Sequence, residues 1–346
     1  MPDPDSDEIG LPAVMCLLQS ISERCVTLGI YVEGHAAFAI VADNLASYSF
    51  SRLTQMALIN IEPGWDRMRA AQTLDPTPDF IRIGDPAMRH LRLVGFGLSM
   101  RCNRNFRHIT ILVLGNLDKT TAPTMADLYG VLFEATWLEA LSVGKLDRTG
   151  ESLNGEPNYD LPSTDPLDER KPLILRRLNK LHFFAGGNKV FDQLLSLLQA
   201  PTLDMLDVRL MDERDWSSLL GCADLVCPVK ALRIYGVCKS ELDLFALSIL
   251  MPEVTVLDVT TADRALARCA AMAGFRWTKV RALRLRNPRT ESIRGILAAV
   301  AVGNLRIHYP FPAKMLSRAE TEWISTKVET VVLTVEWAQA WYATTR

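Results

Sequence analysis

The chain has 346 residues, 49% of them hydrophobic, and a formal net charge of −2 at pH 7. This composition supplies a large core, and the near-balanced charge argues against a general nucleic-acid binder. The seven cysteines are odd in number and form no C-x-x-C pair, which argues against a zinc site and favours buried free thiols in a reducing compartment.

The N-terminal residues 1–10 are acidic and contain proline, so we expect them to be disordered. Their charge is opposite to that of a secretory signal. The uncharged run 9–22 is too short to span a bilayer. We therefore expect a soluble intracellular protein, cytoplasmic or nuclear, with no membrane partner.

The next segment, Leu11–Glu23, is predicted to form a helix that covers the first strand. Apolar residues at spacing i, i+3, i+4, i+7 predict its buried face. These residues are Val14, Leu17, Leu18 and Ile21.

From residue 25 onward the pattern apolar-x-x-apolar-x-apolar occurs twelve times. Four consecutive copies, centred on residues 206 to 283, follow at steps of 26, 25 and 26. A fixed period in the twenties with this pattern is typical of a leucine-rich-repeat solenoid. The sequence therefore predicts one α/β leucine-rich-repeat domain of about twelve repeats over residues 11–336. The central residues are Leu28, Met56, Leu91, Leu112, Leu141, Leu181, Leu206, Leu232, Leu257, Leu283, Leu305 and Val331.

The segments between these copies carry helical spacing. Strand, helix and strand at this period require parallel strands with right-handed crossover helices. We predict a horseshoe-shaped arc with the strands along its concave face and the helices along its convex face. The helical stripes begin at Leu128, Phe191, Trp216, Leu266 and Ile293. Candidate N-caps are Asn188, Ser240 and Thr290.

Three segments interrupt the period. A loop is predicted at 75–79, and a turn or single helical coil between Leu91 and Leu112. Residues 147–172 are rich in Gly, Pro, Ser and charge. We interpret them as a mobile insertion, which is either a partner-binding loop or a solvated segment without a special role.

The last residues, 337–346, follow the final copy of the pattern. The last strand of a repeat array otherwise exposes its edge and its core. We therefore predict a C-terminal cap or tail that contains the aromatic residues Trp337, Trp341 and Tyr342.

Two segments carry a family resemblance. Residues 194–208 (LLSLLQAPTLDMLDV) and 88–98 (MRHLRLVGFGL) resemble the repeat region of the fungal F-box/leucine-rich-repeat family. In that family an N-terminal F-box binds a Skp-type adaptor of a cullin ubiquitin ligase, and the repeats hold the protein to be ubiquitinated. The resemblance implies a role in substrate recognition for such a ligase.

The F-box itself is not found in this sequence. Leu11-Pro12 is followed by Ala-Val-Met-Cys, and the first repeat strand starts by Cys25, which leaves no room for an F-box. We therefore do not expect this chain to bind a Skp-type adaptor by itself. It is either a truncated product or a repeat protein without ligase attachment.

Residues that alternate with the apolar positions of each strand are predicted to line the concave face. Basic residues predominate at these positions in the C-terminal half of the chain, so this half of the face is predicted to be net positive. The predicted ligand-binding residues are Arg92, Lys180, His182, Arg209, Arg233, Tyr235, Arg284, Arg286, Arg306 and His308.

Two interpretations of this face stay open. Directly after the central positions, charges alternate in sign and can pair across strands in a self-satisfied ladder. Alternatively, the basic surplus binds an acidic or phosphorylated peptide, because arginine forms bidentate bonds with carboxylate and phosphate. The ladder residues are His182, Asp207, Arg233, Asp258 and Arg284.

The sequence gives little support to catalysis. Gly95-Phe-Gly97 lacks the third glycine of a dinucleotide loop, and no Walker, zinc-protease, nucleophile-elbow or kinase motif occurs. We predict a protein-binding scaffold with no catalytic residue, cofactor or metal, and the resemblance implies substrate recognition for a cullin-type ubiquitin ligase. The alternatives are an adaptor with no ubiquitin link and a small-molecule hydrolase.

Overall fold

The computed structural model describes most of the chain with gaps. Several predicted features lie outside the described residues: the loop 75–79, Gly95 to Gly97, Asn188, residues 147–170 of the insertion and the C-terminal residues 337–346. The described residues are 6–32, 37, 40–41, 44–45, 47–60, 88–94, 106–115, 125–144, 171–184, 189–210, 213–222, 228–236, 240–260, 263–310 and 316–336.

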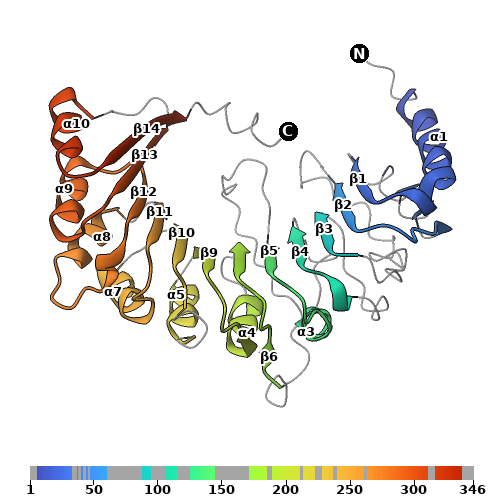
Figure 1. Ribbon diagram of the computed structural model, residues 1–346, viewed down its shortest axis with the longest axis horizontal. Helices are drawn as coiled ribbons and strands as arrows, with labels where there is room; N and C mark the ends of the chain where they lie inside the picture. The colour runs from blue at the N-terminus through green and yellow to red at the C-terminus, as the bar shows by residue number, and fades with distance from the viewer. Residues whose placement is uncertain are drawn as a thin grey trace. The chain divides into compact units, whose positions relative to one another are not determined.

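Within these residues the protein has an α/β fold with a twelve-stranded sheet (Figure 1). The strands join in chain order, β1-β2-β3-β4-β5-β7-β9-β10-β11-β12-β13-β14. The pairings are parallel, as predicted. The strands are β1 (Thr27–Val32), β2 (Gln55–Asn60), β3 (His90–Val94), β4 (Ile111–Gly115), β5 (Ala140–Gly144), β7 (Lys180–Phe184), β9 (Met205–Leu210), β10 (Ala231–Gly236), β11 (Val256–Thr260), β12 (Ala282–Arg286), β13 (Asn304–Pro310) and β14 (Thr330–Glu336).

The chain divides into two compact units, the first containing β1–β5 and the second containing β7 and β9–β14. The described helices of the first unit are α1 (Ser6–Ile21) and α3 (Met125–Glu134). Those of the second unit are α4 (Lys189–Leu197), α5 (Glu213–Leu220), α7 (Glu241–Leu250), α8 (Asp263–Ala270), α9 (Thr290–Ala299) and α10 (Arg318–Ser325). In the second unit a helix follows each strand from β7 to β13, and these helices lie on one side of the strands (Figure 1).

One hydrogen-bond arrangement recurs at the entry to the strands. In the second unit the carbonyl oxygen of Asn179 accepts hydrogen bonds from the N–H groups of Asp204 and Met205, both at 2.9 Å. In the first unit the carbonyl oxygen of Thr54 accepts hydrogen bonds in the same way, from two N–H groups at the entry to β3, at 2.8 and 3.1 Å. Because each acceptor lies two residues before a central residue of the pattern, equivalent positions are brought side by side. The other acceptors are Val26, Arg89, Thr110, Asp204, Lys230, Thr255 and Arg281.

The resulting register confirms the predicted alignment of the repeated pattern. Leu206 lies opposite Leu232, and Leu232 lies opposite Leu257. All three leucines are buried, with at most 2% of their surface exposed. Leu194 and Ile293 of the predicted helical stripes are equally buried, whereas Leu220 and Leu297 are half-buried and Ala273 is exposed. Burial of each such side chain stabilises the fold by roughly 1.5–3 kcal/mol.

Helix α1 buries a different face from the predicted one. Val14, Leu17 and Ile21 are 59%, 63% and 38% exposed, whereas Met15 is buried. The hydroxyl of Tyr48 donates a hydrogen bond to the carbonyl oxygen of Met15 at 2.7 Å. Because apolar residues surround much of this helix, their spacing alone did not identify the packed face.

Helix starts are predicted less well than strands. Helix α1 begins at Ser6, before the predicted Leu11. Ser240 is confirmed as an N-cap, since its hydroxyl accepts a hydrogen bond from the first turn of α7 at 3.1 Å. The prediction for Thr290 is wrong, because Arg289 is the N-cap residue of α9. The backbone N–H of Arg289 instead donates to a carboxylate of α8 at 3.1 Å.

Two further predictions concern short features. A 3₁₀ helix, η4 (Phe106–His108), lies in the connection between β3 and β4, where a turn or a single helical coil was expected.

Cys269 is buried as predicted, but Cys16 is exposed, so the prediction of buried thiols is wrong for this residue. Among the described helices, none is long and apolar enough to cross a membrane.

Candidate functional site

The candidate site is the side of the sheet that faces away from the helices in the second unit, which we call the open face. The register brings the residues that follow the central leucines into one row on this face. His182 lies opposite Asp207, and Asp207 lies opposite Arg233. Arg233 then lies opposite Asp258, which lies opposite Arg284.

These five residues form a charge ladder of four contacts. The Nδ1 atom of His182 lies 3.1 Å from Oδ2 of Asp207, and Nη1 of Arg233 lies 3.7 Å from the same oxygen. The Nε atom of Arg233 lies 4.0 Å from Oδ2 of Asp258, and Nη1 of Arg284 lies 3.5 Å from that oxygen. The pairing across neighbouring strands that the sequence predicted for these residues is therefore confirmed.

The ladder has a buried acidic part and a partly exposed basic part. Asp207 and Asp258 are 3% and 6% exposed, whereas the side chains of Arg233 and Arg284 are each 39% exposed. Burying a carboxylate is costly unless it is paired. The two arginines therefore cover the carboxylates and still present part of their surface to solvent.

Burial also shifts the pKa values of two side chains on the open face. It raises the pKa of the Asp258 carboxyl, against the opposite effect of Arg284 and Arg233. Burial first, and then the nearby Asp207 and Asp258, raise the pKa of Tyr235 to about 12.

Next to the ladder lies a cluster of four basic side chains on β12 and β13, which we call the basic block. The register places Arg284 opposite Arg306, and Arg286 opposite His308. Asp258 offsets the charge of Arg284, while the neighbouring strand β14 places uncharged residues opposite the two β13 members. Arg284 and Arg306 carry like charges at opposite positions of neighbouring strands and repel each other, whereas both ring nitrogens of His308 are buried. The basic block thus places Arg286 and Arg306 beside Arg284, at one end of the ladder.

The remaining predicted site residues are less closely associated. Lys180 is exposed at the start of β7, and its register partner is Met205. Arg209 lies opposite Tyr235, but its side chain is outside the described part. Arg92 lies on β3 of the first unit between two uncharged residues, so it belongs to neither the ladder nor the basic block.

The list of predicted binding residues did not contain the two carboxylates that anchor the arginines. Asp207 and Asp258 were expected only as ladder members, yet they are the buried centre of the arrangement. One sequence signal marks them, because both lie in the tripeptide Leu-Asp-Val, at 206–208 and 257–259. An acid between two buried strand residues that occurs again in a second strand points to a structural charge.

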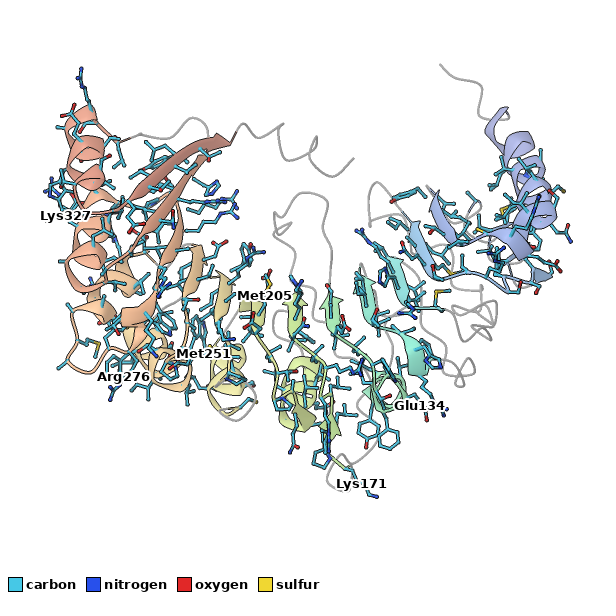
Figure 2. All side chains as sticks on the ribbon, in the orientation of Figure 1. Glu134, Lys171, Met205, Met251, Arg276 and Lys327 are labelled. Atoms are coloured by element: carbon cyan, nitrogen blue, oxygen red, sulfur yellow. The ribbon has the colours of Figure 1, made fainter. Side chains whose placement is uncertain are left out.

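The helix side of the second unit carries charge of a different kind. Arg276 and Lys327 are exposed there, away from the strands (Figure 2). Among the described residues, no group of three His, Cys, Asp or Glu side chains could hold a metal ion. On the open face, the half-exposed guanidinium groups of Arg233 and Arg284 offer hydrogen bonds and ion pairs.

No protein-family model matches the chain, and no curated protein matches it either. The case for function thus depends on the chemistry of the open face.

Proposed function

We propose that the chain is a leucine-rich-repeat solenoid that binds a protein partner on the open face of its second unit. Support for the solenoid comes from the repeat steps of 25 and 26 residues, the alternation of strand and helix, and the recurrent carbonyl acceptor at the strand entries. In a repeat protein each unit packs on its neighbours and the array presents an extended surface. Such a surface suits a protein segment.

The proposed partner segment is acidic or phosphorylated. The observation that carries this proposal is the register of the basic block, which aligns Arg284 with Arg306 and Arg286 with His308. A bound carboxylate or phosphate would offset the repulsion between Arg284 and Arg306. Arginine suits this role because its planar guanidinium binds both anions with two parallel hydrogen bonds. Arg306 is exposed, so an anion reaches it from solvent.

The charge ladder supports this site by orienting it. Asp258 contacts both Arg233 and Arg284, so their guanidinium groups are positioned before a partner arrives. Association costs free energy for every side chain that it must immobilise. Because the buried carboxylate already holds the two arginine side chains, this cost is lower and one geometry of the bound segment is favoured.

The resemblance to the fungal F-box/leucine-rich-repeat family extends the proposal to substrate recognition for a cullin-type ubiquitin ligase. The alternative is an adaptor with no ubiquitin link. Recovery of a Skp-type adaptor and a cullin with the purified chain would favour the first role. Recovery of a partner without any ligase subunit would favour the second.

The test is a pull-down from native extract, with bound proteins identified by mass spectrometry. Wild type is compared with the double variant Arg286→Glu/Arg306→Glu. The matched control is Arg276→Glu/Lys327→Glu, which changes the net charge equally but on the helix side. We expect partners that the block variant loses and the control retains. Partners retained equally by all three proteins would show that binding takes place elsewhere.

A further inference from the structure

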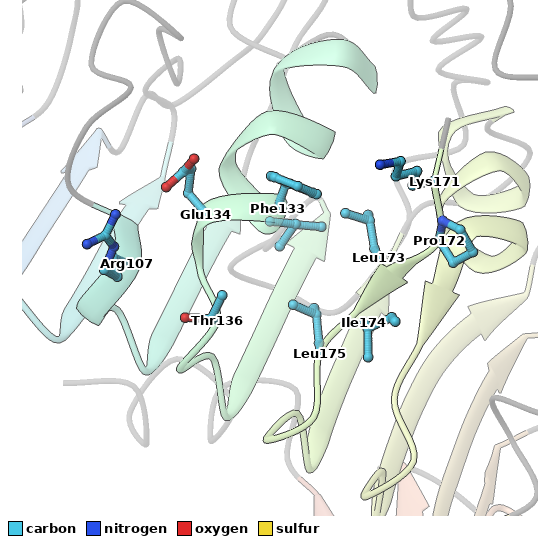
Figure 3. A pocket seen from close by; sticks show the side chains of 10 residues that line it. Arg107, Phe133, Glu134, Thr136, Lys171, Pro172, Leu173, Ile174 and Leu175 are labelled. Atoms are coloured by element: carbon cyan, nitrogen blue, oxygen red, sulfur yellow. The ribbon is translucent and has the colours of Figure 1, made fainter. Parts of the chain in front are cut away.

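A pocket of about 600 Å³ lies in the first unit (Figure 3). It is formed by η4, by the C-terminal end of α3 and by residues 171–175, which include the short strand β6 (Leu173–Ile174). The hydroxyl of Tyr129 on α3 donates a hydrogen bond to the carbonyl oxygen of Lys171 at 3.1 Å. This hydrogen bond holds residues 171–175 against α3. The volume is within the range of small-molecule sites, roughly 300–1,000 Å³.

The lining is mainly apolar and partly exposed. Leu132, Leu173 and Leu175 are buried beneath it. Phe133 and Ile174, by contrast, are 55% and 53% exposed. Large apolar side chains that meet water around a pocket favour a ligand that covers them. The lining thus fits an apolar ligand body.

Three lining residues of the pocket carry charge: Arg107, Glu134 and Lys171. Figure 3 shows Arg107 and Glu134 toward one end and Lys171 at the other, with Phe133 between them. Lys171 is therefore the charged lining residue at its own end of the pocket. An ammonium group with three donors binds a carboxylate strongly.

We propose that this pocket binds a small amphiphilic anion, a medium-chain carboxylate, with its apolar chain on Phe133 and Leu173 and its carboxylate at Lys171. One negative charge matches the net charge of the three lining residues. The site belongs to the first unit and does not depend on the open face of the second.

The experiment uses the full chain and a dansyl-labelled undecanoic acid, whose fluorescence reports binding. Decanoate and decanol, which have equal chain length, are the competitors. We expect decanoate to displace the probe more effectively than decanol at one saturable site. Lys171→Gln should weaken decanoate by roughly tenfold or more and leave decanol unchanged, since it removes one charge-assisted hydrogen bond.

Two further variants complete the test. Arg107→Gln should change the affinity for decanoate by less than about twofold, because Arg107 is exposed and lies at the opposite end of the pocket from Lys171. Ile174→Glu alters an exposed position and places a carboxylate at the pocket, so it should abolish displacement by decanoate. If Lys171→Gln fails to fold, the result with Ile174→Glu tests the proposal in its place. Equal competition by decanoate and decanol, or decanoate binding that neither variant weakens, would overturn the proposal and leave an apolar groove for a peptide side chain.

Discussion

The two units share a backbone pattern and differ in what they display on it. Both use the recurrent carbonyl acceptor at the strand entries, and both bury the central residue of their strands, with the exception of the half-buried Val331 on β14. In the first unit the position after this central residue carries one charge, Arg92. In the second unit the same position carries the charge ladder, which includes Arg284 of the basic block, and a second member of the block, Arg306.

This difference separates the strand positions that must be apolar from the positions at which the side chain can vary. The buried positions must be apolar in every strand because they pack between the sheet and its connecting segments. The positions between them contact solvent or a partner and can vary without changing the register. Function should therefore be localised by the chemistry of the second unit, while stability should depend on both units in the same way.

The largest expected effect concerns the shared core. Leu206→Asp in the second unit and Leu112→Asp in the first each place an unpaired carboxylate at a position with 0% exposure. Each should lower the free energy of unfolding by more than about 4 kcal/mol and abolish cooperative folding of its region. Thermal melts followed by circular dichroism check this. A soluble, cooperatively melting protein from either variant would contradict the shared register.

A smaller effect should distinguish the units. Asp207→Ala removes the acid that contacts His182 and Arg233. Because these partners are 28% and 39% exposed, solvent compensates in part, and the loss should be about 1–3 kcal/mol. The control is Ser142→Ala at the equivalent position of the first unit, which should cost less than about 0.5 kcal/mol. Chemical denaturation measures both, and equal losses would remove the proposed distinction between the two faces.

The smallest effect is a dependence on pH. Burial raises the pKa of Asp258 in the folded state, so the folded protein binds a proton more readily than the unfolded chain. The stabilisation from this proton is complete below the unfolded pKa and is lost as pH rises through the folded pKa. Asp258→Asn removes this titration. The melting temperature of the wild type should therefore rise relative to that of the variant as pH falls toward the acidic range. A constant difference across pH would show that Asp258 does not titrate in this way.

The sequence predicted the sheet well because the spacing of its apolar residues is regular. The registers of Leu206 with Leu232 and of Arg284 with Arg306 follow directly from counting along the repeats. The packed face of α1 was not predictable in the same way. Met15 is apolar like Val14 and Leu17, so apolar residues lie on more than one face of the helix, and of these three only Met15 is buried. Only the tertiary contact with Met15 selects the face.

The candidate site was predictable in part. The ladder followed from alternating charges at equivalent positions. The burial of Asp207 and Asp258 was not predicted, because it depends on how the arginines fold over them. The pocket in the first unit had no sequence signal, since its lining comes from segments around residues 107, 132–136 and 171–175. No periodic pattern connects these segments.

The most direct measurement is a fluorescence anisotropy titration of an acidic peptide that carries phosphoserine, with its unphosphorylated counterpart as reference. Wild type should bind the phosphopeptide, and added salt should weaken the binding. Arg286→Glu/Arg306→Glu should weaken it by roughly a hundredfold, since two charge-assisted contacts are lost, while Arg276→Glu/Lys327→Glu should leave it unchanged. Equal affinities for the wild type and the block variant, or equal loss in both double variants, would contradict a binding site on the open face of the second unit.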